Sequence, residues 1–202
     1  MGTPTPSEKR FPPLPLRTRG ALAAGRLTAR ASRAAGRGHG GVVGGTVALK
    51  LDPEALRLLA RGRTTALVSA SNGKSTTAAL LAAAVSRLGP TAYNENGSNM
   101  ASGLVVALEA AQESPYAVLE TDESYLGPVT AATRPRAIAL LNLSRDYLER
   151  GVRYKPLARH WRQTLEGVDW PLTVVANADD PIVTWAARTS RTTIVHLRAG
   201  AG

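Results

Sequence analysis

The 202-residue sequence contains no cysteine and few aromatic residues. Without cysteine the chain has no disulfide and no thiolate metal site, which fits a reducing compartment. Aromatic side chains make up only 4% of the residues, so alanine, leucine and valine must fill most of the core. No apolar run reaches the roughly 18 residues of a membrane-spanning helix, and the N-terminus lacks the apolar segment of a secretory signal. We therefore expect a cytoplasmic protein.

Acidic residues are scarce in the first third of the chain. Residues 1–63 carry 12 of the 25 lysines and arginines but 3 of the 15 acidic residues, and so hold +9 of the net +10 charge. Five arginines recur here at helical spacing, which predicts a basic amphipathic helix: Arg19, Arg26, Arg30, Arg33 and Arg37. Such a helix could contact anionic lipid at the inner membrane face, hold an acidic partner, or pack on the body with its arginines in solvent. Nucleic acid is a poor fit, because no aromatic residues accompany the arginines for base stacking.

Turn-forming residues divide this first part of the chain. Proline, threonine and serine concentrate in residues 1–16, which we expect to be a flexible leader. Six glycines from 36 to 45 predict a loop, and alternation over 46–51 predicts a short strand. Asp52 is the predicted N-cap of a helix over 53–60. Residues 17–63 should therefore form a basic helix and a small α/β arm.

From residue 64 onward, apolar runs alternate with helical patterns. Strands are predicted over 64–70, 91–93, 116–121, 136–143, 172–176 and 192–197, and helices near 74–88, 98–112, 124–132, 155–166 and 181–188. The strand at 136–143 contains a continuous apolar run, as strands buried on both faces of a parallel sheet do. The pattern predicts an α/β fold of three αβα layers with a mostly parallel sheet, whose ligands bind at the carboxyl ends of the strands.

A polar turn follows the first of these strands and opens a helix. Backbone N–H groups at a helix N-terminus bind oxyanions, a lysine neutralises phosphate charge and a hydroxyl ligates Mg²⁺. We therefore predict a P-loop-like nucleotide-phosphate site with Lys74 on phosphate and Ser75 on Mg²⁺. The alternative is a helix N-cap with a solvated lysine, since two positions that are glycine in such loops are Val68 and Ala70 here.

The strand at 116–121 runs into three carboxylates, the first of which, Glu120, is at the strand end. Mg²⁺ prefers oxygen ligands and is usually held by one or two carboxylates together with phosphate and water. We predict that Glu120 completes the metal site begun by Ser75, with Asp122 and Glu123 as second candidates. The alternative is a solvated acidic turn.

Three further polar segments also follow strands. Residues 94–100 offer three amides that suit a polar ligand, although Asn-Gly is also an ordinary turn. In residues 142–150, Asp146 could face the phosphates or pair with the arginine before it. Asn177 could read adenine through its amide, and Asp180 should cap the helix that follows.

The order of these motifs resembles the Mur ligase superfamily, and most closely its MurT branch. The five segments that carry the resemblance are 71–77, 94–100, 120–123, 142–150 and 177–181. MurT is the ATP-using subunit of lipid II isoglutaminyl synthase and works with the glutaminase GatD. The resemblance implies that ATP and Mg²⁺ activate the D-glutamate α-carboxylate of lipid II as an acyl phosphate, which ammonia from a GatD-type partner converts to D-isoglutamine.

The resemblance also implies roles for individual residues. Catalysis would involve Lys74, Glu120 and Asp146. Mg²⁺ would be held by Ser75 and Glu120. The nucleotide would contact Ser71, Asn72, Gly73, Lys74, Ser75, Thr76, Asn99 and Asn177.

The family pattern extends beyond what this sequence contains. Ala70 and Ser71 stand where the family has Gly-Thr. The family continues with a four-cysteine zinc ribbon, the rest of the central domain and a C-terminal domain, none of which is in this sequence. Residues 64–202 are therefore expected to be a partial central ATP-binding domain. Two other functions stay open: a non-catalytic nucleotide-binding remnant, and another ligase of the superfamily, similar to folylpolyglutamate synthase.

Overall fold

The structure is a computed structural model that describes residues 11–36, 41–95, 97–143, 154–189 and 193–197. The elements follow along the chain as α1 (Leu16–Ala34), α2 (Gly41–Leu51), α3 (Ala55–Ala60), β1 (Thr64–Ser69), α4 (Lys74–Val85), β2 (Thr91–Tyr93), α5 (Ala101–Ala110), β3 (Tyr116–Glu120), α6 (Leu126–Thr133), β4 (Ala137–Leu140), α7 (Tyr154–Glu166), β5 (Thr173–Asn177), α8 (Pro181–Ala187) and β6 (Thr193–Leu197). Within these residues no helix combines the length and the apolar character needed to cross a bilayer.

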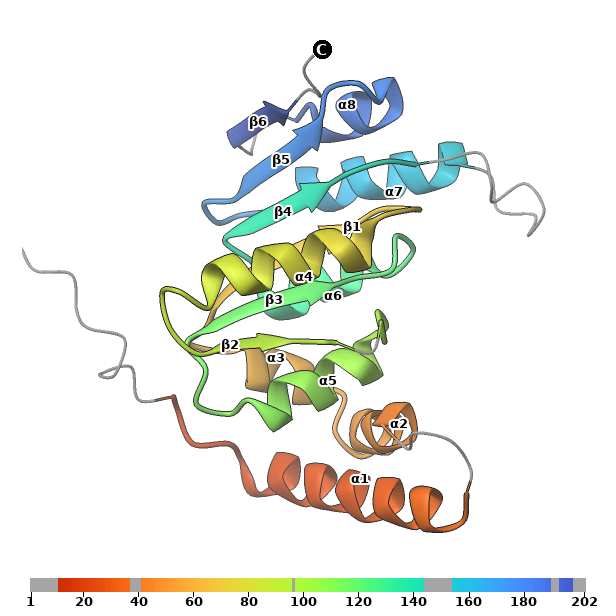
Figure 1. Cartoon of the computed structure of the whole chain (residues 1–202), viewed down its shortest axis with the longest axis vertical. Coiled ribbons are helices and arrows are strands. Elements are labelled where there is room, and N and C mark those ends of the chain that lie inside the picture. Colours follow the sequence, from red (N-terminus) through yellow and green to blue (C-terminus); the bar gives the residue numbers. More distant parts are fainter. Residues whose placement is uncertain (1–10, 37–40, 96, 144–153, 190–192, 198–202) are drawn as a thin grey trace, which may run out of the picture.

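The six strands form one sheet in the order β2-β3-β1-β4-β5-β6 (Figure 1). Every neighbouring pair is parallel. Parallel neighbours need crossover connections, and helices supply them between successive strands. The predicted α/β fold with a parallel sheet is confirmed.

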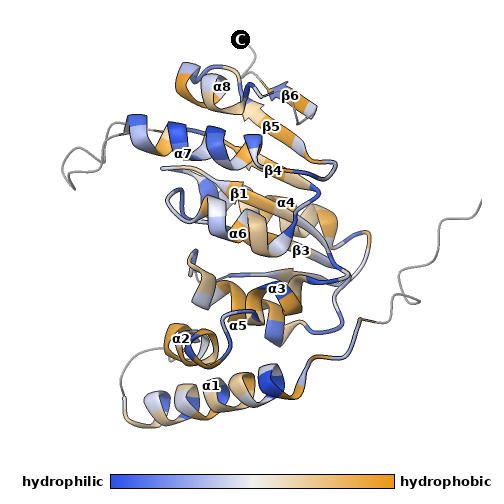
Figure 2. Cartoon of the chain, turned by 180° about the vertical axis from the view of Figure 1, so that it is seen from behind, coloured by the Kyte–Doolittle hydropathy of each residue, from blue (hydrophilic) through white to orange (hydrophobic). Residues whose placement is uncertain are grey.

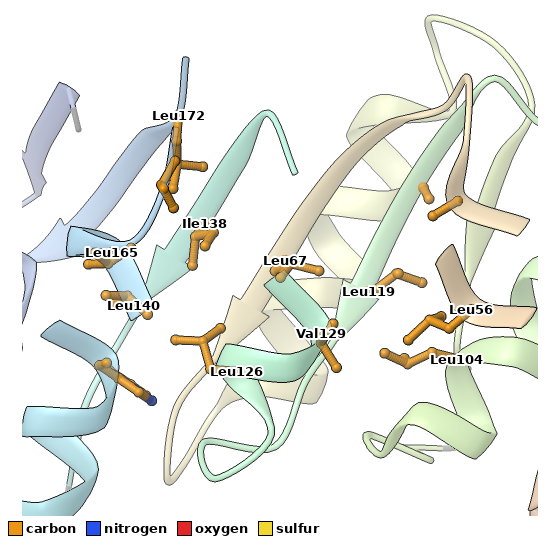
Figure 3. Packing of buried hydrophobic residues seen from close by; sticks show 14 of the residues in the cluster. Leu56, Leu67, Leu104, Leu119, Leu126, Val129, Ile138, Leu140, Leu165 and Leu172 are labelled. Carbon is orange, nitrogen blue, oxygen red and sulfur yellow. The ribbon is translucent and has the colours of Figure 1, made fainter. Parts of the chain in front are cut away.

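Helices cover both faces of the sheet. On one face α4 packs Ala78 and Ala82 against Val68 and Val118. The other face carries the larger core, to which α3, α5, α6 and α7 contribute, and Figures 1 and 2 show α4 and α6 on opposite sides of the sheet. Figure 3 shows leucines of the sheet and of these helices pointing into that shared layer. The predicted three αβα layers are therefore present.

The predicted strand over 46–51 is wrong, because these residues belong to the helix α2. The predicted loop over 36–45 also ends early, since α2 begins at Gly41. Alternating apolar residues favoured a strand, but α2 is packed between α1 and α5 through Gly44, Gly45 and Ala48, which are all buried. Tertiary packing has overridden local propensity here, as it often does for β-branched residues.

The start of α3 also differs from the prediction. The helix begins at Ala55, and its N-cap position is Glu54, so Asp52 is not the N-cap. Asp52 is buried instead, accepting a hydrogen bond from the Thr18 hydroxyl at 2.6 Å and one from the Glu54 amide at 3.2 Å. A buried carboxylate requires such partners, and this one ties α1 to the start of α3.

Helices α1 and α2 touch through backbone atoms. A Cβ atom added to Gly25 would lie 2.5 Å from the Gly44 carbonyl oxygen, and one added to Gly44 would lie 2.8 Å from the Gly25 oxygen. No side chain other than hydrogen fits between helices that approach so closely. The two glycines therefore set the distance between α1 and α2.

Arg63 joins α3 of this helical arm to the C-terminal end of α5. The Arg63 guanidinium donates to carbonyl oxygens at the C-terminal ends of α3 and α5, at 2.7 to 3.1 Å: Leu59, Leu108, Ala111, Gln112 and Ser114. A cation is favourable at helix C-termini. Burial lowers the pKa of Arg63 to about 10, so the group stays charged at neutral pH. In the predicted leader, Phe11 packs its ring 5.1 Å from this guanidinium, while residues 1–10 lie outside the described part.

Replacement of Gly25 by alanine should destabilise the chain, whereas the same change at Gly20 should not. The new methyl group at Gly25 would overlap the Gly44 backbone and should lower the free energy of unfolding by about 1–3 kcal/mol. Gly20 lies in the same helix with open space around it, so alanine there should raise that free energy by about 0.5–1 kcal/mol. Urea denaturation of both variants measures the difference. Equal effects of the two changes would contradict the close helix approach.

Candidate functional site

The polar turn predicted to bind phosphate lies between β1 and α4. Gly73 occupies the N-cap position of α4 with φ of 80°, in the left-handed region that favours glycine. None of the described side chains caps this helix, so the amides of its first turn remain available to an anion. Ala70 is completely buried, so its methyl group packs in the interior. The turn has the geometry of an oxyanion cradle without the family glycine.

The turn is held in place by Asn142, which follows β4. Its side-chain oxygen accepts from the Asn72 amide at 3.0 Å, and its side-chain nitrogen donates to the Asn72 carbonyl at 2.9 Å. The Ser71 amide donates to the Asn142 carbonyl at 3.0 Å. The segment at 142–150 was predicted to place polar groups after a strand, but Asn142 was not singled out. Its position directly after β4, the neighbour of β1, was the signal that could have identified it.

Lys74 turns back toward the loop and a buried carboxylate. Its Nζ donates to the Ser71 carbonyl at 3.2 Å and lies 3.8 Å from Oε2 of Glu123. The Lys74 side chain is 15% exposed and that of Glu123 is 1% exposed. The lysine thus pairs with a carboxylate that water hardly reaches, and its contact with phosphate stays a prediction.

Two carboxylates lie inside the protein at the carboxyl end of the β1–β3 pair: Glu120 is the last residue of β3, and Glu123 follows it. Val68 of β1 pairs with Glu120 of β3, so the carboxyl ends of these strands are level. Oε2 of Glu120 and both carboxylate oxygens of Glu123 are buried without a hydrogen bond to any part of the chain that the structure describes. Burial of a charged group without partners is costly. These oxygens therefore fit a site that receives a cation.

Asn94 and Tyr93 of the β2 end position this site. The Asn94 side chain accepts from the Glu120 amide at 2.8 Å and donates to the Glu120 carbonyl at 3.0 Å, which fixes the end of β3. The Tyr93 hydroxyl donates to the Ser75 carbonyl at 3.3 Å. Burial raises the pKa of Tyr93, and the nearby charges of Glu120 and Glu95 raise it further. Tyr93 therefore joins Ser75 of the phosphate loop to the acidic strand end.

The residues around the loop suit a hard cation. A hydroxyl at Ser75 and carboxylates at Glu120 and Glu123 offer only oxygen, the ligand type that Mg²⁺ prefers. Among the described residues no group of three or more His, Cys, Asp or Glu side chains could hold a metal alone. Mg²⁺ is usually held by one or two carboxylates together with phosphate and water, so its binding at Ser75 and Glu120 stays a prediction.

The remaining predicted residues are less closely gathered. The Asn99 carbonyl accepts from the Asp122 amide at 3.0 Å, which places Asn99 beside the end of β3. The Asn177 side chain accepts from the Asp179 amide at 3.0 Å, within its own turn after β5. Thr76 is exposed in the first turn of α4. Asp146 lies outside the described residues, and contact of Asn177 with adenine stays a prediction.

Asp180 caps α8 as predicted. Its carboxylate accepts from the Ile182 amide at 2.8 Å and from the Val183 amide at 3.1 Å. Its second oxygen accepts from the Leu143 amide at 3.0 Å. The cap thus also ties α8 to the segment that follows β4.

Comparison with known proteins identifies relatives of this chain. A sequence profile described as the Mur ligase middle domain matches residues 68–201. The MurT subunits of lipid II isoglutaminyl synthase (glutamine-hydrolyzing) from Staphylococcus aureus strain N315 and from Streptococcus pneumoniae strain ATCC BAA-255 / R6 are each 29% identical, over 162 and 152 residues. The matches cover 78% and 72% of this chain but only 36% and 33% of the relatives, so the chain spans about a third of their length.

Solved structures show the same fold. MurF from Acinetobacter baumannii superposes with a TM-score of 0.60 at 21% identity, covering 74% of this chain and 34% of that one. A UDP-N-acetylmuramoylalanyl-D-glutamyl-2,6-diaminopimelate--D-alanyl-D-alanyl ligase from the same organism also gives 0.60, at 20% identity and the same coverage.

Lys74 and Glu123 should show energetic coupling. Replacement of Lys74 by methionine leaves the buried Glu123 carboxylate without its nearest cation, whereas the added Glu123→Gln change removes that charge. A double-mutant cycle in urea, without nucleotide, should give a coupling free energy of roughly 1–2 kcal/mol. The control pairs Lys74→Met with Glu166→Gln in α7, where the effects should add. Additive effects of the Lys74 and Glu123 changes would show that the two groups do not interact.

Asn142 should order the phosphate loop. Its replacement by alanine removes both side-chain hydrogen bonds to Asn72, so the Asn72 amide hydrogen should exchange with solvent about tenfold faster, for a loss of about 1.4 kcal/mol. Hydrogen exchange followed by NMR measures this rate, with the exposed Gln163→Ala as control. An unchanged Asn72 rate would mean that other contacts hold the loop.

Proposed function

Since this chain belongs to the Mur ligase family, we propose that it forms the ATP-binding part of a MurT-type amide ligase. The predicted resemblance to this family and to its MurT branch is confirmed by the profile match and by the MurT relatives. The observation that carries the proposal is the set of buried carboxylate oxygens of Glu120 and Glu123 that form no hydrogen bond within the described residues, beside Lys74 and the N-terminal end of α4. Mg²⁺ would supply positive charge to the carboxylates, and the nucleotide phosphate would supply negative charge to Lys74 and to the amides at the N-terminal end of α4.

The proposed reaction is activation of a carboxylate for amide formation. Bound ATP would supply a phosphoryl group to the D-glutamate α-carboxylate of lipid II, with ADP leaving, and ammonia would then displace phosphate to give D-isoglutamine. Mg²⁺, if bound, would neutralise charge on the phosphoryl oxygens. The acyl phosphate is required because a carboxylate oxygen is a poor leaving group and phosphate is a good one.

The residues of this chain would bind and orient the nucleotide. Amides of the first turn of α4 would hold phosphate oxygens, and Lys74 would leave the Ser71 carbonyl to contact them. Ser75 and Glu120 would hold Mg²⁺, with Glu123 behind them as a further carboxylate. We include Glu123 because its carboxylate is buried next to Lys74.

The proposed partners follow from the MurT relatives. A GatD-type glutaminase would supply ammonia, lipid II would be the acceptor, and both would meet the chain on the cytoplasmic side of the membrane. The 202 residues contain no cysteine that could ligate the zinc of the family's ribbon.

A second candidate is a nucleotide-binding protein without ligase activity. The observation that favours it is the loss of both glycine positions in the loop, where Val68 and Ala70 are completely buried. Both candidates require ATP binding, and only one requires turnover.

ATP should bind more tightly with Mg²⁺ than without it. Lys74→Ala should weaken Mg²⁺–ATP binding by roughly one to two orders of magnitude, because a charge-assisted contact to phosphate is lost. Glu120→Gln should remove most of the difference that Mg²⁺ makes, while Lys50→Ala, on the exposed side of α2, should change nothing. Isothermal titration of the full chain measures each Kd. A Kd for ATP that changes neither when Mg²⁺ is removed nor when Lys74 is replaced would refute the proposed site.

Turnover separates the two candidates. With Mg²⁺–ATP, a GatD-type partner, glutamine and lipid II supplied, the ligase candidate predicts amidated lipid II and ADP, detected by mass spectrometry. Mg²⁺-dependent ATP binding without amidated product would favour the non-catalytic candidate.

A further inference from the structure

The side of α1 that faces away from α2 carries an exposed apolar stripe. Its members recur every three or four residues and so lie along one line of the helix: Leu16, Gly20, Ala23, Leu27, Ala31 and Ala34. The buried face of α1 is a different one, formed by Thr18, Ala21, Leu22, Gly25 and Ala29. Leu16 is 81% exposed and Leu27 is 64% exposed, so two large apolar side chains lie in solvent on this stripe.

A row of arginines runs between this apolar stripe and the buried face. It consists of Arg19, Arg26, Arg30 and Arg33. Arg26 pairs with Glu109 of α5, whereas Arg30 and Arg33 form no ion pair with the described part of the chain. Together Arg26, Arg30 and Arg33 line a recess of about 320 Å³ between α1, α2 and α5. Two arginines without an ion pair in the described part of the chain, Arg30 and Arg33, thus border this recess.

The surrounding surface adds little negative charge: the recess is also lined by Glu109 of α5, which is paired with Arg26. Neither α1 nor α2 contains an acidic residue, while α1 also carries Arg17 and α2 carries Lys50. Figure 1 shows α1 as the outermost layer of the molecule, with the other elements on its far side. A flat surface could therefore approach α1 along its whole length without meeting the sheet.

We propose that α1 docks on the surface of a bilayer that contains anionic phospholipid. The apolar stripe lies at the boundary of the acyl chains, and the arginine row contacts the headgroup phosphates, with one headgroup in the recess. This division of one helix into an apolar line and an adjoining cationic line matches the two zones of a lipid surface.

An acidic protein is a weaker fit for this face. Protein interfaces usually centre on large side chains, aromatic ones above all, that fill pockets of the partner. The stripe contains no aromatic residue, and its members between the two leucines are glycine and alanine. A lipid surface needs no such anchors. The inference does not depend on the proposed ATP chemistry, because α1 contributes no residue to the phosphate site.

Vesicle binding of the full chain tests the inference. We expect sedimentation with vesicles of phosphatidylcholine mixed with phosphatidylglycerol, little with phosphatidylcholine alone, and weaker binding as salt is raised. The triple variant Arg19→Gln, Arg30→Gln, Arg33→Gln should lower the partition coefficient by roughly two orders of magnitude. A charge-matched control replaces three exposed arginines elsewhere by glutamine and should keep wild-type binding: Arg87, Arg136 and Arg159.

The apolar stripe is tested separately by Leu16→Ser with Leu27→Ser. Both side chains are exposed, so the fold should persist, while vesicle binding should fall severalfold as apolar contact is lost. Circular dichroism confirms that each variant is folded, and the salt and lipid dependence of the wild-type chain tests the proposal without any variant. Equal binding to neutral vesicles, loss of binding in the charge-matched control, or no binding to anionic vesicles would overturn it. The last outcome would leave the face to a protein partner.

Discussion

The structure depends most on two carboxylates that the sheet carries into its interior. Glu120 ends β3 and Glu123 follows it, and three of their four oxygens lack hydrogen bonds within the described residues. Lys74 is the nearest cation to Glu123, but it also lies where phosphate is expected. Such an arrangement costs stability in the empty protein and favours any ligand that adds positive charge. The fold thus keeps these carboxylate oxygens buried at the edge of the sheet where the proposed nucleotide would bind.

Much of the fold could be predicted from the sequence because the parallel sheet leaves a strong pattern. A strand was predicted at each of the six positions where the sheet has one, and the prediction for 91–93 matches β2 at both ends. The failures cluster in the arm, where small residues decide the structure. Gly44, Gly45 and Ala48 read as loop and strand by propensity, yet their lack of bulk lets α2 pack between two other helices. Helix and strand propensities describe each residue by itself, whereas α2 forms because its small residues let α1 and α5 pack closely against it.

The residue types of the candidate site could be predicted from the sequence, but the side chains that hold its backbone in place could not. Lys74 and Glu120 were identified because their residue types and positions match phosphate and metal binding, and the strand register brings their segments to one edge of the sheet. Asn142 and Asn94 could not be assigned, because their partners lie 70 and 26 residues away and are backbone groups with no sequence signature. Glu123 was only a second candidate, since nothing in the sequence shows that it is more deeply buried than Asp122.

The contact between Gly25 and Gly44 has a consequence for how the arm can move. Side chains at most helix interfaces change rotamer and let the helices slide by small steps. Here backbone meets backbone, so no rotamer can absorb a partial displacement. Helices α1 and α2 should therefore move together as one rigid unit. A displacement of α1 should either shift α5 and the β2 edge of the sheet or separate both helices from the body together.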